Sequence, residues 1–304
     1  MPIRSAAPVS ALLLASGIAV AQETPSSPPA GIEPPVPTAR FAWDVPASGE
    51  WDLVLGAWLP RFEGKLRWGS SGTEFEANDL DLDDLEASFA GDLSWRNEWV
   101  RATIGGFDFS TSGSATLAAG SVVGGTTFSS ATAATTAASM WSVGGQVAVT
   151  LWRPFASRTA LWNGPVESPA GLGPNGSSVD LSFECLLALR YLSLSQSVTT
   201  ATTSAVFDQS ALGIGIGGGI RFRWLPAETF TPMHGLDIFA TAAAGPAVFG
   251  GGSFVQLETG IEWEVCPNFA ARFGYRLLDW TIEADGDRSA AGLQGLFVGG
   301  RLTF

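Results

Sequence analysis

Apolar and polar side chains alternate along most of the chain from residue 51 onward. Between Ala211 and Leu225, apolar side chains occupy nearly every second position from Leu212 to Trp224, and glycine or arginine occupies the positions between them. Alternation of this kind is typical of a β-strand whose two faces meet different surroundings. Ten segments show it and predict ten strands. These segments are 51–59, 86–95, 98 to about 112, 141–151, 179 to about 195, 211–225, 236–249, 253–265, 269 to about 283, and 292–304.

The hydrophobic residues are numerous but dispersed. They make up 46% of the chain. No stretch after the N-terminal region approaches the ~20 consecutive apolar residues that a membrane-spanning helix needs. In lipid every backbone donor and acceptor must be paired within the protein, so only helices or closed barrels can span a membrane. We therefore predict an all-β fold, a closed antiparallel transmembrane β-barrel of about ten strands, with eight or twelve strands as alternatives.

Aromatic side chains gather near the strand ends that carry short turns, at Arg96–Asn97 and at 266–268. Bacterial barrels have short periplasmic turns, and amphipathic rings at the headgroup level form a girdle there. The long connection from Arg153 to Ser178 departs from this rule. A water-soluble all-β protein would instead bury these rings in its core. The predicted girdle consists of Trp51, Trp95, Trp224, Trp263, Phe269 and Phe304.

The opposite face of the predicted strands carries charges, and the short turns fix their register. This register predicts three ion pairs inside the barrel. A slip by one residue would move these charges into lipid, at a cost of about 2–4 kcal/mol for each basic side chain at mid-depth. The predicted pairs are Asp92 with Arg101, Glu258 with Arg276, and Glu262 with Arg272, and further inward charges are Glu184, Arg190, Arg221 and Arg223.

The paired charges predict a closed interior. In a barrel of eight to ten strands, side chains nearly fill the space inside the wall. The alternative is a narrow, charge-lined pore for small polar solutes. The alternating glycines of segment 211–225 are compatible with both, because they either make room for bulky inward groups or open a gap.

The N-terminal region has the parts of a secretory signal peptide, which we predict over residues 1–21. Arg4 supplies the positive start, residues 11–20 form an apolar run, and small residues precede Gln22. Residues 22–45 are rich in proline and predict a periplasmic leader. Residues 46–304 are predicted to form the barrel. This arrangement predicts export through the Sec pathway and a location in the bacterial outer membrane.

The charge and the cysteines exclude several classes of function. A net charge of −13 argues against binding to nucleic acid. Two cysteines cannot form a metal cluster by themselves. Cys185 lies within a predicted wall strand and Cys266 in a predicted turn, so we expect no disulfide between them. No cofactor is expected.

Two short segments are candidates for chemistry. His234, the only histidine, lies in a predicted periplasmic turn, so a histidine-dependent protease or lipase is not expected. The acidic segment 78–85 offers Asp79, Asp81 and Asp83 as a weak candidate metal site. It lacks the glycine and the terminal glutamate of a calcium-binding loop, which favours a solvated acidic loop or a short helix.

Residues 113–139 consist almost entirely of glycine, alanine, serine and threonine. Such a composition carries no ligand signal. It predicts either a flexible outer loop or an extension of two long strands above the bilayer.

The last strand, with Phe297, Gly299, Leu302 and Phe304, resembles the C-terminal assembly signal of bacterial outer-membrane β-barrels. Short stretches in the order 55–60, 81–91, 188–191 and 273–276 also resemble small barrels of the OmpA-type transmembrane family. The resemblance implies an integral outer-membrane barrel that the barrel-assembly machinery recognises through its C-terminal strand. It implies no active-site residues. We expect no peptidoglycan-binding domain after the barrel, so the resemblance carries over no wall-tethering role.

These observations favour a structural or surface-interaction protein, monomeric, in contact with outer-membrane lipids. The first alternative is the narrow pore. The second is a membrane-embedded lipid-modifying enzyme, which would need a polar constellation at the outer mouth. We expect no enzymatic activity.

Overall fold

The computed structural model describes residues 49–156, 160, 177–226, 233–249, 251–284 and 286–304. The predicted signal peptide, the predicted leader and residues 157–159 and 161–176 of the Arg153–Ser178 connection lie outside these residues. No helix among the described residues is long and apolar enough to cross a membrane.

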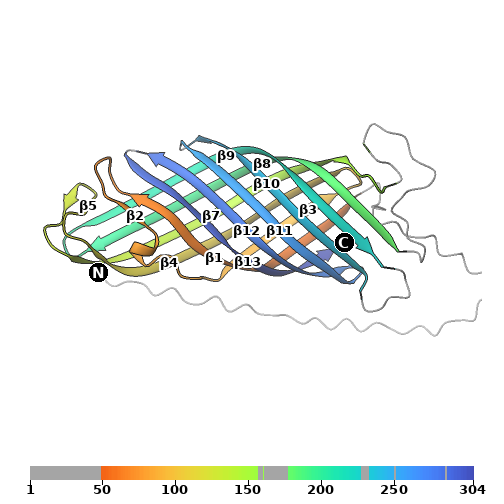
Figure 1. Cartoon of the computed structure of the whole chain (residues 1–304), viewed down its shortest axis with the longest axis horizontal. Helices are drawn as coiled ribbons and strands as arrows, with labels where there is room; N and C mark the ends of the chain where they lie inside the picture. Colours follow the sequence, from red (N-terminus) through yellow and green to blue (C-terminus); the bar gives the residue numbers. More distant parts are fainter. Residues whose placement is uncertain (1–48, 157–159, 161–176, 227–232, 250, 285) are drawn as a thin grey trace, which may run out of the picture. The chain divides into compact units, whose positions relative to one another are not determined.

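Within the described residues, ten antiparallel strands close into a ring, because the last strand pairs with the first. This confirms the predicted all-β barrel and its strand number. The strands slant across the barrel (Figure 1). They are β1 (Glu50–Arg67), β3 (Ser88–Arg96), β4 (Val100–Leu117), β7 (Thr132–Trp152), β8 (Ser178–Thr200), β9 (Ser204–Leu225), β10 (Gly235–Phe249), β11 (Ser253–Cys266), β12 (Phe269–Ala284) and β13 (Asp287–Thr303).

Four short elements lie near the end of the barrel opposite the C-terminus, which we call the upper end (left in Figure 1). Strand β2 (Glu74–Glu76) extends the sheet beside β1, and β5 (Val122–Val123) pairs with β6 (Thr126–Thr127) in a small hairpin. A 3₁₀ helix, η1 (Asn78–Leu80), follows β2. The end that carries the β3–β4 and β11–β12 turns is the lower end.

The ring closes at an uninterrupted seam between β1 and β13. Pairing runs from Asp52 with Thr303 to Arg67 with Arg288. At the lower end, the Trp51 N–H donates to the Phe304 carbonyl at 3.0 Å, and the Phe304 N–H donates to the Trp51 carbonyl at 2.9 Å. Closure removes the open edges that would otherwise expose unpaired backbone groups.

The outward face of the wall changes character along the long strand β8. On β8 the outward positions are apolar as far as Tyr191, and Leu187 and Leu189 are exposed. Above Tyr191 the same face carries Ser193, Ser195, Ser197 and Thr199. Along β8 the outer surface is therefore apolar in the lower half of the barrel and polar in the upper half, and β1 changes in the same sense between Leu59 and Arg61.

The inward face changes in the opposite sense. The inward positions of β8 carry Asp180 and Glu184 in the lower half, whereas Leu192, Leu194 and Val198 are buried in the upper half. The upper half thus has a hydrophobic core, and each large apolar side chain buried there contributes about 1.5–3 kcal/mol. This core includes Phe62, Leu66, Phe109, Leu117, Met140, Phe207, Phe254, Trp280, Ile282 and Leu293.

The acidic loop folds over the upper end and into this core. Leu80 and Leu82 are buried, and the Thr136 hydroxyl donates to the Leu80 carbonyl at 2.6 Å. A Cβ on Gly113 would lie 1.9 Å from the carbonyl oxygen of Asp81, so the close approach of the loop to β4 requires glycine there. Of the two alternatives for this segment, the short helix is present as η1 at Asn78–Leu80. The segment is not merely solvated, because Leu80 and Leu82 supply part of the core.

The segment rich in small residues forms strand extensions at both of its ends, and residues 118–131 between them form a connection that contains the β5–β6 hairpin. Strand β4 continues to Leu117 and β7 begins at Thr132, and their pairing runs without a break to Leu117 and Thr132. Of the two alternatives for residues 113–139, the extension of two long strands is therefore correct for 113–117 and 132–139.

Candidate lumen ion-pair network and cavities

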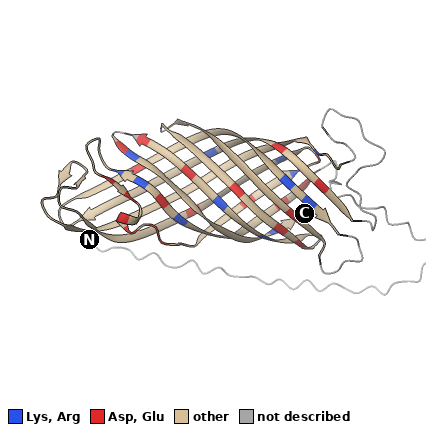
Figure 2. Ribbon diagram, in the orientation of Figure 1, with Lys and Arg blue, Asp and Glu red and all other residues tan. Residues whose placement is uncertain are grey.

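A network of ion pairs fills the lower half of the lumen, and Glu262 lies at its centre. Its side chain is almost fully buried between two arginines. Arg272 Nη1 lies 3.1 Å from Glu262 Oε1, and Arg301 Nη1 lies 2.9 Å from Glu262 Oε2. Glu262 faces Arg272 across the β11–β12 ladder, at the position that the turn-based register predicts. Figure 2 shows acidic and basic residues interspersed along the wall strands.

The second predicted pair on this ladder is also formed. Glu258 faces Arg276, and the Arg276 Nε lies 2.8 Å from Glu258 Oε1. Arg272 Nη2 lies 2.6 Å from the same oxygen, so Glu258 joins two arginines. Arg276 additionally forms an ion pair with Asp92 on β3. This pair links β12 to a strand that is not its neighbour in the sheet.

The predicted pairing of Asp92 with Arg101 is wrong. The turn is longer than Arg96–Asn97, because the Asn97 N–H donates to the Val100 carbonyl at 2.9 Å. The Asn97 side-chain oxygen also accepts hydrogen bonds from the backbone N–H groups of Trp99 and Val100. The four-residue turn shifts the register, so Asp92 faces Gly105.

Arg101 instead forms an ion pair with Glu184 on β8, at 2.6 Å. The two residues lie on strands separated by β7, so their side chains meet inside the lumen. Both were predicted to point inward, but a pairing between strands that are not neighbours cannot be derived from turn lengths.

Several members of the network were not singled out from the sequence. Arg221 pairs with Asp237, and Arg223 lies 3.0 Å from Glu264. Apart from Arg153, which follows the end of β7, the missed members occupy inward strand positions, so the alternation of side chains was the available signal. The missed members are Glu50, Asp52, Arg96, Arg153, Asp180, Asp237, Glu264 and Arg301.

Arg190 differs from the other lumen arginines. Among the described residues, no carboxylate lies within ion-pair distance of it. Its Nη2 and Nε donate to the Gln256 side-chain oxygen at 3.0 and 3.3 Å, and its Nη1 lies 3.4 Å from the Ser142 hydroxyl. A Cβ on Gly144 would lie 2.9 Å from the guanidinium carbon, so glycine makes room for this group.

Inward aromatic rings line part of the network. The guanidinium of Arg272 lies 4.6 Å from the ring centroid of Phe239, and that of Arg276 lies 4.1 Å from the centroid of Phe297. Such contacts favour a desolvated guanidinium by about 2 kcal/mol. Phe297, one residue of the predicted assembly signal, is therefore an interior residue.

The other residues of the predicted assembly signal lie elsewhere. Leu302 and Phe304 are exposed on the outer surface. Gly299 lies against β1, where a Cβ would be 2.5 Å from the Leu55 carbonyl oxygen. The C-terminal strand thus contributes to the interior, the seam and the outer surface.

The predicted girdle residues all lie on the outward face near the lower end. Trp51, Trp263, Phe269 and Phe304 are exposed, and Trp95 and Trp224 are partly exposed. Trp152 adds an exposed ring that the prediction missed; its ring stacks on Phe183 with the centroids 5.2 Å apart.

A second pair of outward aromatics, Trp141 and Tyr191, lies higher on the wall, with ring centroids 5.0 Å apart. Trp141 and Trp152 lie on the same strand and are separated by about 36 Å of strand at ~3.3 Å per residue. A strand tilted by about 45° makes this an apolar band about 25 Å tall.

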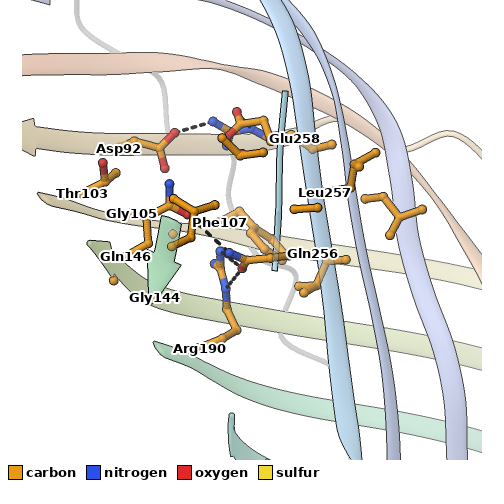
Figure 3. Close-up of a pocket in the computed structure, with 18 of the residues that line it drawn as sticks. Asp92, Thr103, Gly105, Phe107, Gly144, Gln146, Arg190, Gln256, Leu257 and Glu258 are labelled. Carbon is orange, nitrogen blue, oxygen red and sulfur yellow. Dashed lines mark hydrogen bonds and ion pairs between the residues drawn. The ribbon is translucent and has the colours of Figure 1, made fainter. Parts of the chain in front are cut away.

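Two small cavities adjoin inside the lower half. The upper one, of about 100 Å³, is lined by Arg190, Gln146, Gln256 and Glu258 among others (Figure 3). The lower one, of about 90 Å³, reaches the β3–β4 turn. Both are lined in part by Ser94, Arg101 and Arg272.

Apolar side chains bound the upper cavity toward the upper end. Trp58 and Phe107 line it and contact each other edge to face, with centroids 4.8 Å apart. Leu278 lines it as well. The hydrophobic core begins with these residues, so polar space and apolar core meet at this level.

The remaining candidate residues form no constellation. His234 is exposed, and its backbone N–H donates to the Glu264 carbonyl. Cys185 and Cys266 are free and exposed. In the acidic loop, Asp79 accepts a hydrogen bond from the Glu76 N–H and Asp81 from the Ser114 N–H.

Asp83, the third residue of the weak metal candidate, has an intermediate exposure. Within the part of the chain that the structure describes, no group of three or more histidine, cysteine or acidic residues is placed to hold a metal ion.

No protein-family model matches the chain, and no curated protein sequence matches it. Solved outer-membrane barrels are similar at low identity. Neisserial surface protein A is 13% identical over 84% of this chain and 97% of its own, with a TM-score of 0.33. The outer membrane protease OmpT from Escherichia coli is 11% identical over 88% and 99%, with a TM-score of 0.40.

The toluene transporter TodX of P. putida is 9% identical over 86% of this chain and 91% of its own, with a TM-score of 0.24. Similarities this distant assign neither a family nor a function. The fold assignment therefore rests on the strand pairing of this chain.

The central ion pair predicts non-additive stability. Each of Glu262→Ala and Arg272→Ala leaves a buried charge without one of its partners, and each is expected to cost about 3–5 kcal/mol. The double variant is expected to cost less than the sum of the two, by about 1 kcal/mol or more. Urea unfolding of the protein folded in detergent micelles measures all three values.

The exposed pair of Lys65 and Glu74, with nitrogen and oxygen 3.1 Å apart on the upper wall, is the control. Surface pairs couple weakly. Alanine variants of these two residues are expected to be additive. Additive losses for Glu262 and Arg272 would contradict direct pairing.

Proposed function

We propose that this chain is an integral barrel of the bacterial outer membrane, exported through a Sec signal. The proposal is supported by the way the distribution of apolar and polar side chains between the two faces of the wall changes along the strands. The lower wall carries apolar side chains outward and charged side chains inward. In the upper wall, polar side chains such as serine and threonine point outward and apolar side chains point inward. An apolar band about 25 Å tall with aromatic residues at both margins is what a membrane-spanning barrel needs.

The proposed role is structural or surface-interactive and non-enzymatic. The single observation that carries it is the hydrophobic core of the upper half, capped by Leu80 and Leu82 of the acidic loop. This core separates the charged lower lumen from the upper end of the barrel. A barrel filled in this way presents its polar upper wall and loops to the outside without a wide channel.

The proposed partners follow from the same surfaces. Outer-membrane lipids contact the apolar band, and the barrel-assembly machinery recognises the C-terminal strand, which forms the closing seam with β1. We propose a monomer, because the ring closes within one chain and leaves no open sheet edge for a second copy.

A narrow pore for small polar solutes is the second candidate. The two adjoining cavities in the lower lumen favour it, because they form polar space inside the wall. They end at Trp58, Phe107 and Leu278. Conduction would require the core above these residues to rearrange.

Conductance in a planar lipid bilayer tests the closed interior. The purified barrel, shown to be folded by its heat-dependent mobility on detergent gels, is expected to give no steady channel at neutral pH. Flotation of reconstituted vesicles serves as the control for insertion. Steady unitary openings would contradict the closed-core role and favour the pore.

The position of the membrane is tested by one substitution at two heights on β8. Leu187 and Ser195 point outward on the same strand, and Leu187 lies between Val147 and Ile216. Leu187→Arg places a charge at mid-depth and is expected to cost about 2–4 kcal/mol in lipid vesicles. Urea unfolding gives the free energy of unfolding for each variant.

Ser195→Arg is the matched control. Its neighbours are Ser139 and Asp208, both above the apolar band. This variant is expected to change the free energy of unfolding by less than about 0.5 kcal/mol. Equal losses for the two variants would place both residues in the same solvent and overturn the proposed membrane position.

A further inference from the structure

Within the described part of the chain, Arg190 in the upper lumen cavity has no carboxylate within ion-pair distance, although Asp92 and Glu258 line the same cavity. Arg190 reaches this cavity from β8 and donates to the side-chain oxygen of Gln256 (Figure 3). Its Nη1 lies 3.4 Å from the Ser142 hydroxyl. A buried charge is costly unless it is paired or well hydrogen-bonded. A structural arginine in this lumen would be expected to have a carboxylate beside it, as Arg101, Arg272 and Arg276 do.

The wall is shaped to accommodate this group. The absence of a side chain at Gly144 lets the guanidinium lie against β7, since a Cβ there would be 2.9 Å from its Cζ and Nε. Glycine at 105 and 106 also lines the cavity. The resulting space of about 100 Å³ exceeds the ~30 Å³ that one water molecule occupies in the liquid.

Other donors line the same space. Gln146 accepts a hydrogen bond from Gln256 through its side-chain oxygen, which leaves its NH₂ group able to donate into the cavity. Thr241 lines the cavity from β10. The two carboxylates of the lining, Asp92 and Glu258, are both engaged by Arg276.

We propose that this cavity binds one small monovalent anion of the size of chloride, held by Arg190 with the amide of Gln146 and the hydroxyl of Thr241. The anion enters from the lower end, because the lower cavity adjoins the upper one at Arg101 and Arg272. The site ends at Trp58 and Phe107, so binding does not require passage through the barrel. Anion binding at this site does not depend on the proposed cellular role of the barrel.

Thermal unfolding of the full-length folded barrel in detergent tests the site. Sodium chloride is exchanged for sodium gluconate at constant ionic strength, because gluconate is too large for the cavity. An anion that binds only the folded state raises the unfolding midpoint, and we expect a rise of about 3 °C or more between zero and 300 mM chloride.

Arg190→Gln removes the guanidinium and is expected to abolish the chloride-dependent rise. Arg61→Gln is the matched control, because it removes the same charge from an exposed outward position. This control is expected to keep the full rise. A rise of equal size in Arg190→Gln, or none in the unaltered protein, would overturn the proposal.

Crystals of the unaltered barrel grown in sodium bromide give a second measurement that does not depend on the folding of any variant. An anomalous bromide peak within hydrogen-bond distance of Arg190 is expected. No peak at that place would overturn the proposal. A peak without a chloride-dependent rise in the midpoint would mean binding at crystal concentration only, and would also overturn it.

Discussion

Every backbone donor and acceptor in a wall that faces hydrocarbon needs a partner within the protein, and the seam between β1 and β13 meets this need for the whole ring. The seam joins the first and last strands of the barrel, and the backbone hydrogen bonds between Trp51 and Phe304 continue it at the lower end. Once the ring is closed, each strand has an inner and an outer face. The alternation of side chains then determines, at every height of the wall, which side chains face the surroundings of the barrel and which face its interior.

The two halves of the barrel meet this constraint in opposite ways. Where the outer face is apolar, the interior holds charges, and these are satisfied by pairing with one another, as Glu262 is by Arg272 and Arg301. Where the outer face turns to serine and threonine, the interior holds leucine and phenylalanine. The upper half is stabilised by burial of apolar surface, as a water-soluble protein is. The ion-pair network in the lower half is costly to break, because removing one charge leaves its buried partner unpaired.

This division explains what could be predicted from the sequence. We could predict the number of strands, the face of the strand on which each side chain lies, and the lower ends of the strands. These features were predictable because apolar outward residues contrast with charged inward ones. The upper ends were not, because serine, threonine and alanine contrast weakly along residues 113–139 and 193–199. Glu262 and Arg272 could be paired because a short turn fixes their register, whereas the side chain of Asn97 lengthens the turn near Asp92. Contacts between non-adjacent strands, such as Arg101 with Glu184, depend on closure of the ring, which no local pattern encodes.

The central claim is that the outer face of one strand passes from hydrocarbon to water near Tyr191, and spin labelling along β8 measures this directly. Single cysteines at outward positions from 181 to 199, in a chain whose Cys185 and Cys266 are replaced by alanine, would be labelled in lipid vesicles. Collision with oxygen and with a water-soluble nickel chelate would then be compared at each site. We predict that oxygen dominates as far as residue 191 and that the nickel chelate dominates from residue 193 onward. Nickel accessibility that is uniform along the strand would contradict the account.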